Sequence, residues 1–102
     1  MSITTSGNSA AGDGISSSGA NATITNTNSG TITTSGDDSH GIGIEFGGNN
    51  ATITNSGSVK ATSNAIGDAY AIYHVGTDVD IINTTTGKIF GVIYTDYGND
   101  TF

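Results

Sequence analysis

Apolar residues alternate with Thr, Ser and Asn in short stretches along this chain. In Thr23-Ile24-Thr25, and again in Thr52-Ile53-Thr54, one apolar side chain lies between two polar ones. A period of two places the Ile on one face of a strand and both Thr on the other. Gly, Asn and Ser, which favour turns, separate these stretches. The pattern therefore predicts many short β-strands, each with one buried face.

The alternating stretches recur along the chain. Residues 21–26 (NATITN) return at 50–55, 29 positions later, and in degenerate form at 78–83 (DVDIIN). Glycine-led segments repeat as well, beginning at Gly30, Gly57 and Gly87, with residues 1–4 as an earlier copy. Repetition at a fixed period indicates stacked structural units. We expect one domain, 1–102, made of coils 1–29, 30–56 and 57–86 and a partial coil 87–102.

The expected fold is all-β: a right-handed parallel β-helix (β-solenoid) of about 3.5 coils of ~29 residues. Each coil contributes three short strands, and equivalent apolar positions of successive coils stack in buried columns. The predicted columns are Ile3/Ile32/Val59/Ile89, Ile24/Ile53/Ile81/Phe102 and Ile15/Ile44/Ile72/Ile93.

Asn and Asp recur at the turns in two further columns. Asn tolerates left-handed backbone, and its amide can bond the equivalent amide one coil away. We therefore assign these positions a structural role as turn ladders. The two ladders are Asn26, Asn55 and Asn83, and Asn21, Asn50, Asp78 and Asn99.

Composition narrows the range of functions. Gly, Thr, Ser and Asn dominate, Pro and Cys are absent, and helix-forming residues are scarce, which argues against helices and disulfides. The chain has nine acidic residues and only two basic ones, Lys60 and Lys88, which gives a net charge of −7. Such a chain cannot neutralise phosphates, so we expect no nucleic-acid partner. No stretch is apolar over the length of a membrane span, so we expect no membrane insertion by this segment.

Some of these strings resemble a known class of repeats. Residues 28–33 (NSGTIT) and 48–57 (GNNATITNSG) are similar to repeats in the passenger regions of bacterial autotransporters and related large secreted β-strand-repeat proteins. The resemblance extends over essentially the whole chain and implies extracellular or cell-surface display as a stalk or adhesin. The signal sequence and C-terminal membrane domain of that family are not recognisable here. The resemblance therefore implies either a segment of a longer passenger or a small relative that stands alone.

Calcium is the one cofactor that the sequence suggests. Gly98-Asn99-Asp100 resembles half of a calcium-binding repeat, and Asp78 lies at the equivalent turn one coil earlier. Calcium takes six to eight oxygen ligands, and such a site needs two adjacent copies of the repeat. A plain Asn/Asp turn explains the same residues, so we expect no bound metal and keep Asp78, Asn99 and Asp100 as the candidate ligands.

Two surface features allow other functions. The Thr-x-Thr stretches of the first two coils would form an outward Thr ladder, as in ice-binding solenoids, although Asp80 interrupts it in the third coil. Aromatic residues gather toward the C-terminus, and Tyr73, Tyr94 and Tyr97 are candidates for a surface that binds a sugar ring. Catalysis is not expected: Asp37 and Asp38 are adjacent in a loop, where their side chains diverge, and no Arg supports them.

The sequence thus predicts a non-enzymatic structural or adhesive β-solenoid segment of a secreted or cell-surface bacterial protein. One alternative is an extracellular fibre subunit that self-associates through the open ends of the solenoid, because neither end carries a cap. Ice binding is a second alternative. A host receptor or glycan is the other partner that a surface-displayed segment would have.

Overall fold

The computed structural model describes residues 2–5, 14–36, 39–44, 48–62, 69–96 and 98–102. Over these residues the chain is all-β and contains no helix, as predicted. None of them lies in a helix of the length and apolarity needed to cross a membrane. The strands are β1 (Ser2–Thr5), β2 (Ile15–Ser17), β3 (Thr23–Asn26), β4 (Thr31–Thr34), β5 (Ser39–Ile44), β6 (Ala51–Asn55), β7 (Ser58–Ala61), β8 (Ala69–His74), β9 (Val79–Asn83), β10 (Lys88–Phe90) and β11 (Val92–Tyr94).

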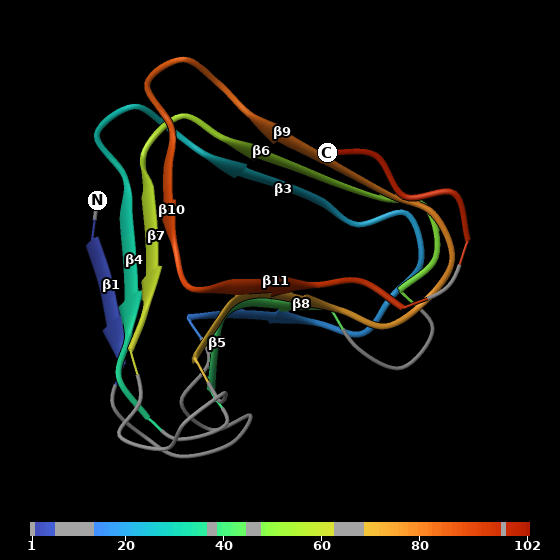
Figure 1. The fold of residues 1–102 in the computed structure, drawn as a ribbon, viewed down its shortest axis with the longest axis horizontal. Helices are drawn as coiled ribbons and strands as arrows, with labels where there is room; N and C mark the ends of the chain where they lie inside the picture. Colours follow the sequence, from blue (N-terminus) through green and yellow to red (C-terminus); the bar gives the residue numbers. More distant parts are fainter. Residues whose placement is uncertain (1, 6–13, 37–38, 45–47, 63–68, 97) are drawn as a thin grey trace.

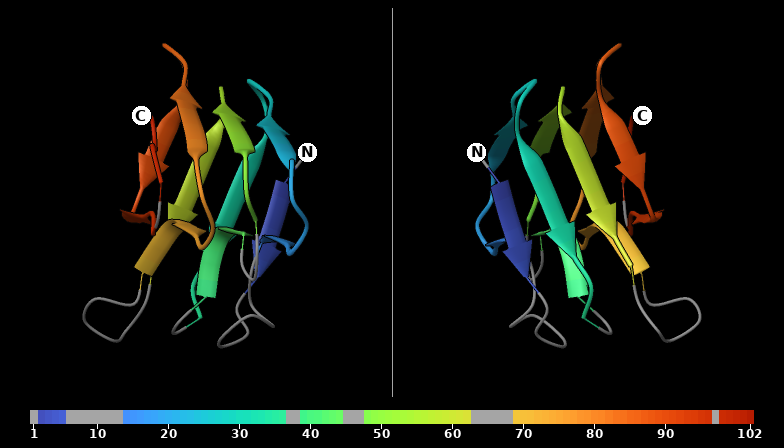
Figure 2. Two further views of the ribbon diagram at one scale, coloured as in Figure 1. Left: turned by 90° about the vertical axis from the view of Figure 1, so that its right-hand side faces the viewer. Right: turned by 90° about the vertical axis from the view of Figure 1, so that its left-hand side faces the viewer.

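The strands form three parallel sheets in which each neighbour comes three strands later in the chain. Sheet A has the order β1-β4-β7-β10, sheet B the order β2-β5-β8-β11, and sheet C the order β3-β6-β9. The three sheets lie on three sides of the molecule, around a common interior (Figure 1). Side views show the strands of each sheet following one another from the N-terminal to the C-terminal end (Figure 2). This arrangement is compatible with a parallel β-helix.

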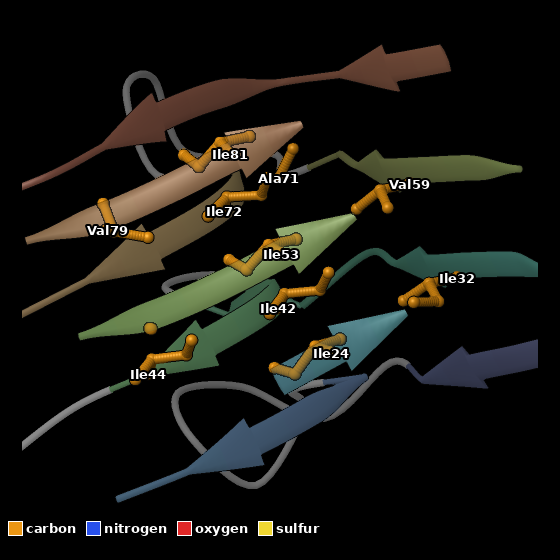
Figure 3. Packing of buried hydrophobic residues seen from close by; sticks show 11 residues of the cluster. Ile24, Ile32, Ile42, Ile44, Ile53, Val59, Ala71, Ile72, Val79 and Ile81 are labelled. Carbon is orange, nitrogen blue, oxygen red and sulfur yellow. The ribbon is translucent and has the colours of Figure 1, made fainter. Parts of the chain in front are cut away.

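The core consists of the inward positions of all three sheets. Along β6 the residues alternate between buried and half-buried, as expected for a strand with one face inside. Ile24, Ile53 and Ile81 pair in register across sheet C and face the interior (Figure 3). In sheet A the predicted column Ile3/Ile32/Val59/Ile89 is also in register.

Two predicted column members are wrong. In sheet B, Ile15 pairs with Ile42, which pairs with Ile72, whereas Ile44 pairs with Ser17 and His74. The error is two residues, and because side chains alternate with a period of two, Ile44 is still buried. Phe102 follows the isolated bridge between Asp80 and Thr101, but its side chain is 82% exposed and does not extend the buried Ile column.

Candidate functional site

A chain of side-chain amides runs along the corner between sheets C and A, buried at Asn26 and Asn55 and exposed at Asn83. The Asn26 Nδ2 donates to the Asn55 Oδ1 over 2.9 Å, and the Asn55 Nδ2 donates to the Asn83 Oδ1 over the same distance. These are the Asn residues that the repeat predicts at the last position of β3, β6 and β9. All three amides point the same way, with nitrogen toward the C-terminal end of the stack and oxygen toward the N-terminal end.

Each amide also secures the turn that follows its strand. The Asn55 Nδ2 donates to the carbonyl oxygens of Gly57 and Lys88, 3.2 and 3.1 Å away. Asn26 makes the equivalent bonds to Gly30 and Ser58. Glycine is needed beside the ladder, because a Cβ at Gly57 would collide with the Gly30 carbonyl oxygen of the turn below. The amides thus supply hydrogen bonds to backbone carbonyl oxygens of these turns, which would otherwise be buried without a partner.

The second Asn column marks the corner that leads into sheet C. Asn21, Asn50 and Asp78 all have left-handed backbone, with φ of 62°, 57° and 57°. Asn and Asp adopt this conformation more readily than other residues with a Cβ. In the last turn Gly98 takes the positive φ, 103°, and Asn99 instead donates its backbone N–H to the Asp78 Oδ1 over 2.7 Å.

The carboxylates suggested as calcium ligands contact the backbone of the turns. Asp78 accepts the bond from Asn99, and the Asp100 Oδ1 accepts one from the Val79 N–H over 3.0 Å. The Val79 bond is the main reason why the pKa of Asp100 lies below its ordinary value; bonding from Thr95 and the charge of His74 act in the same direction, and burial opposes them. Over the described residues, no three His, Asp or Glu side chains gather as a metal site.

An aromatic column lies on the outer face of sheet B. The Tyr73 ring stacks between the rings of His40 and Tyr94, with centroid distances of 4.4 and 4.9 Å and nearly parallel planes. Tyr70 meets all three rings edge-on. Tyr73 pairs in the sheet with Gly43, which has no side chain, and the His40 ring stacks on that side of Tyr73. The sequence prediction of the aromatic surface did not include His40 and Tyr70. The signal available in the sequence was Gly43, which leaves room beside Tyr73 for another ring.

This stacking changes what the aromatic residues can bind. Both faces of the Tyr73 ring are covered, so no sugar ring can stack on it. Tyr94 is 39% exposed, and among the described residues only the Tyr73 ring stacks on it. Any flat ring face offered to a ligand therefore lies at an end of the stack and not at Tyr73. Tyr97, the third predicted aromatic, lies outside the described residues.

His74 is a buried group that the sequence did not single out. Its side chain is fully buried in sheet B, and its Nε2 lies 2.6 Å from the Gly48 carbonyl oxygen. That contact requires the proton on Nε2, because a carbonyl oxygen can only accept. Nδ1 has no hydrogen-bond partner within the described part of the chain.

The outward Thr positions of sheet C form a small array. Thr23 pairs with Thr52 and Thr25 with Thr54, so four Thr occupy two neighbouring strands. The next strand, β9, places Asp80 and the half-exposed Ile82 at these positions. The Thr array therefore covers only β3 and β6 of sheet C, and on β9 an acidic and an apolar residue take the equivalent positions.

A cavity of about 440 Å³ opens at the C-terminal end of the stack. Ile81 and Ile93 form part of its apolar lining, and Asp100 and Phe102 lie at its wall. It occupies the place where the interior of the three sheets is not covered by a further layer of strands. We therefore describe it as the open end of the core.

Comparisons with protein-family models, with curated proteins and with solved structures find no match for this chain.

Proposed function

We propose that this chain is a segment of a right-handed parallel β-helix, with coils of about 29 residues, that serves as a non-enzymatic scaffold or adhesive stalk of a secreted or cell-surface bacterial protein. Two observations support the proposal: the three parallel sheets, and the resemblance of the repeats to autotransporter passengers. In this fold the chain would pass once along each sheet per coil.

The amide ladder of Asn26, Asn55 and Asn83 is the observation that supports the proposal most strongly. Its bonds join residues 29 and 28 positions apart, the spacing of the sequence repeat. A ladder of this kind requires the same side chain at the same corner in successive turns of the chain. It stabilises a long, regular stack, which is the property that a stalk needs.

The distribution of repeated and variable positions supports a scaffold as well. The inward Ile positions and the corner Asn positions recur, whereas the outward positions of one column change from Thr25 and Thr54 to Ile82. A catalytic or ice-binding face would require a defined set of outward groups. The repeat instead specifies the interior and the corners.

Antibodies raised against the folded protein test the proposed location. They should label intact, unpermeabilised cells that produce the protein, or the medium around them. Antibodies against a cytosolic protein of the same cells serve as the control for leakage. Labelling that appears only after permeabilisation would contradict the proposal.

A self-assembling fibre subunit is the second candidate, supported by the edges of the sheets. β10 and β11 are the last strands of sheets A and B, and they expose Phe90 (51%) and Val92 (47%). Exposed apolar edge strands pair readily with other chains. Sedimentation should then show oligomers that dissociate when Val92 is replaced by Lys, whereas Thr25→Lys on the outer face of β3 should leave them intact. A monomer at millimolar concentration would exclude the fibre.

A further inference from the structure

The chain contains four Asn-x-Thr triplets, the pattern of N-glycosylation acceptors when the middle residue is not Pro. The acceptor side chain must be accessible, and its amide nitrogen must be free to react. The four triplets begin at Asn21, Asn50, Asn83 and Asn99. Because they share one sequence pattern, their surroundings in the fold decide which of them can react.

Asn21 and Asn50 meet both requirements. Each is exposed and lies in the corner turn directly before a strand of sheet C. Their backbone N–H groups bond the carbonyl oxygens of Asn49 and Thr77, which fixes the turn. Their side-chain amides have no hydrogen bond to any residue that the structure describes. The left-handed backbone at each Asn makes a tight turn there.

Asn83 has the same triplet in a different setting. Its Nδ2 donates to the Gly87 carbonyl oxygen over 3.0 Å, and its Oδ1 accepts the bond from Asn55 over 2.9 Å. Both ends of the amide therefore belong to the ladder. To react, this side chain would have to leave the corner and break both bonds, which also takes from the Asn55 Nδ2 the shortest of its three hydrogen bonds.

The triplet at Asn99 differs at its third residue. The hydroxyl of Thr101 donates to the Asp80 carboxylate, and its backbone pairs with β9 through bonds to Val79 and Ile81. The hydroxyl that completes the acceptor pattern is thus occupied. Thr23 and Thr52, the third residues of the first two triplets, have no such side-chain bond among the described residues.

We propose that Asn21 and Asn50 are N-glycosylation sites of the folded protein, and that Asn83 is not one. In the reaction the Nδ2 of Asn forms a bond to C1 of a nucleotide-activated hexose. The bond from C1 to the phosphate oxygen breaks, the nucleoside diphosphate leaves with the electron pair, and the amide proton passes to a base of the transferase. Sugars would then line the corner before sheet C, one coil apart. This proposal goes beyond the scaffold function and does not depend on it.

The test compares all four triplets in one reaction. The purified folded protein is incubated with a soluble N-glycosyltransferase specific for Asn-x-Ser/Thr and with UDP-glucose, and the rate at each Asn is measured by peptide mass spectrometry. Synthetic peptides that span each triplet give the rate without the fold. Relative to its own peptide, Asn83 should react at least about tenfold more slowly than Asn21 and Asn50, because its two hydrogen bonds must open first.

Two variants sharpen the result. Thr52→Ala should abolish modification at Asn50 and leave Asn21 unchanged, and Thr52→Ser should retain it. Asn55→Ala removes one bond to Asn83 and should raise the relative rate there. The proposal is overturned if Asn83 reacts as fast as Asn21 and Asn50 in the folded protein, or if Asn21 and Asn50 stay unmodified while their peptides react.

Discussion

The side-chain amide of Asn26 donates a hydrogen bond to the side chain of Asn55, and Asn55 repeats the same bond to Asn83. The central amide makes four bonds and is fully buried, whereas Asn83 is exposed. Position within the ladder, rather than residue type, therefore determines how much each Asn contributes to stability.

Replacing Asn55 by Ala should lower the free energy of unfolding by about 2–4 kcal/mol, because it leaves buried donors and acceptors of both neighbouring turns unpaired. Chemical denaturation followed by circular dichroism measures the change. Asn83→Ala, which removes the exposed end of the same ladder, should cost only about 1 kcal/mol. Equal losses in the two variants would show that the ladder is not a buried network.

Glycine beside the ladder gives a steric prediction. A Cβ at Gly57 would overlap the carbonyl oxygens of Gly30 and Thr27, so Gly57→Ala should cost about 3 kcal/mol or prevent folding. Gly19 is the matched control, because a Cβ there meets nothing within 4 Å. Gly19→Ala should change the free energy of unfolding by less than about 0.5 kcal/mol. A Gly57→Ala protein as stable as Gly19→Ala would exclude the close packing of these turns.

The left-handed backbone at Asn50 predicts which substitutions the turn tolerates. Val is β-branched and disfavours a φ of 57°, so Asn50→Val should lose about 1–2 kcal/mol of stability. Asn50→Gly should retain stability within a few tenths of a kcal/mol, because Gly adopts this conformation without a steric cost. Thermal unfolding of the two variants measures the difference. Val tolerated as well as Gly would mean that the turn is not left-handed.

Acid should weaken the last turn through Asp100. The Val79 N–H bond lowers the pKa of this carboxyl in the folded chain, so its ionised form stabilises the fold above the unfolded pKa, about 4. That stability is lost as the pH falls through the lower pKa of the folded state. Asp100→Asn keeps an oxygen for Val79 but cannot titrate. Its stability, measured from pH 5 to 2, should therefore fall less than that of the unmodified chain; parallel curves would contradict the assignment.

Stacking of Tyr94 on Tyr73 should contribute to the stability of the fold. Tyr94→Ala removes one stacked ring from Tyr73 and should cost about 1 kcal/mol beyond the loss of buried area. Tyr94→Phe keeps the ring and should retain most of that stability. Near-ultraviolet circular dichroism should change strongly in the Ala variant, because the environment of Tyr73 changes with it. An unchanged spectrum would show that the rings do not stack in solution.

The sequence predicted the parts of the fold that depend on close copies. Residues 21–26 and 50–55 are identical, so the pairing of Ile24 with Ile53 followed directly. Sheet B lacks such copies: β5 offers both Ile42 and Ile44, two residues apart on one face, and the pattern alone could not choose between them. The prediction of the aromatic column was incomplete for a related reason. His40 and Tyr73 are not equivalent positions of the repeat, and their rings approach each other because Gly43, which pairs with Tyr73, has no side chain.

Disulfide formation between engineered Cys residues tests the pairing of successive repeats most directly, because the chain has no Cys of its own. Thr25 and Thr54 pair in register on the outer face of sheet C. Their Cα atoms should lie about 4.8 Å apart, within the range of a disulfide. Thr23 and Thr54 are offset by two residues, roughly 8 Å apart, and out of that range.

We expect Thr25→Cys/Thr54→Cys to form an intramolecular disulfide rapidly under mild oxidation, and Thr23→Cys/Thr54→Cys not to form one. Mass spectrometry after alkylation of the free thiols gives the yield for each monomeric variant. Equal yields, or a higher yield for the offset pair, would contradict the in-register stacking of the repeats.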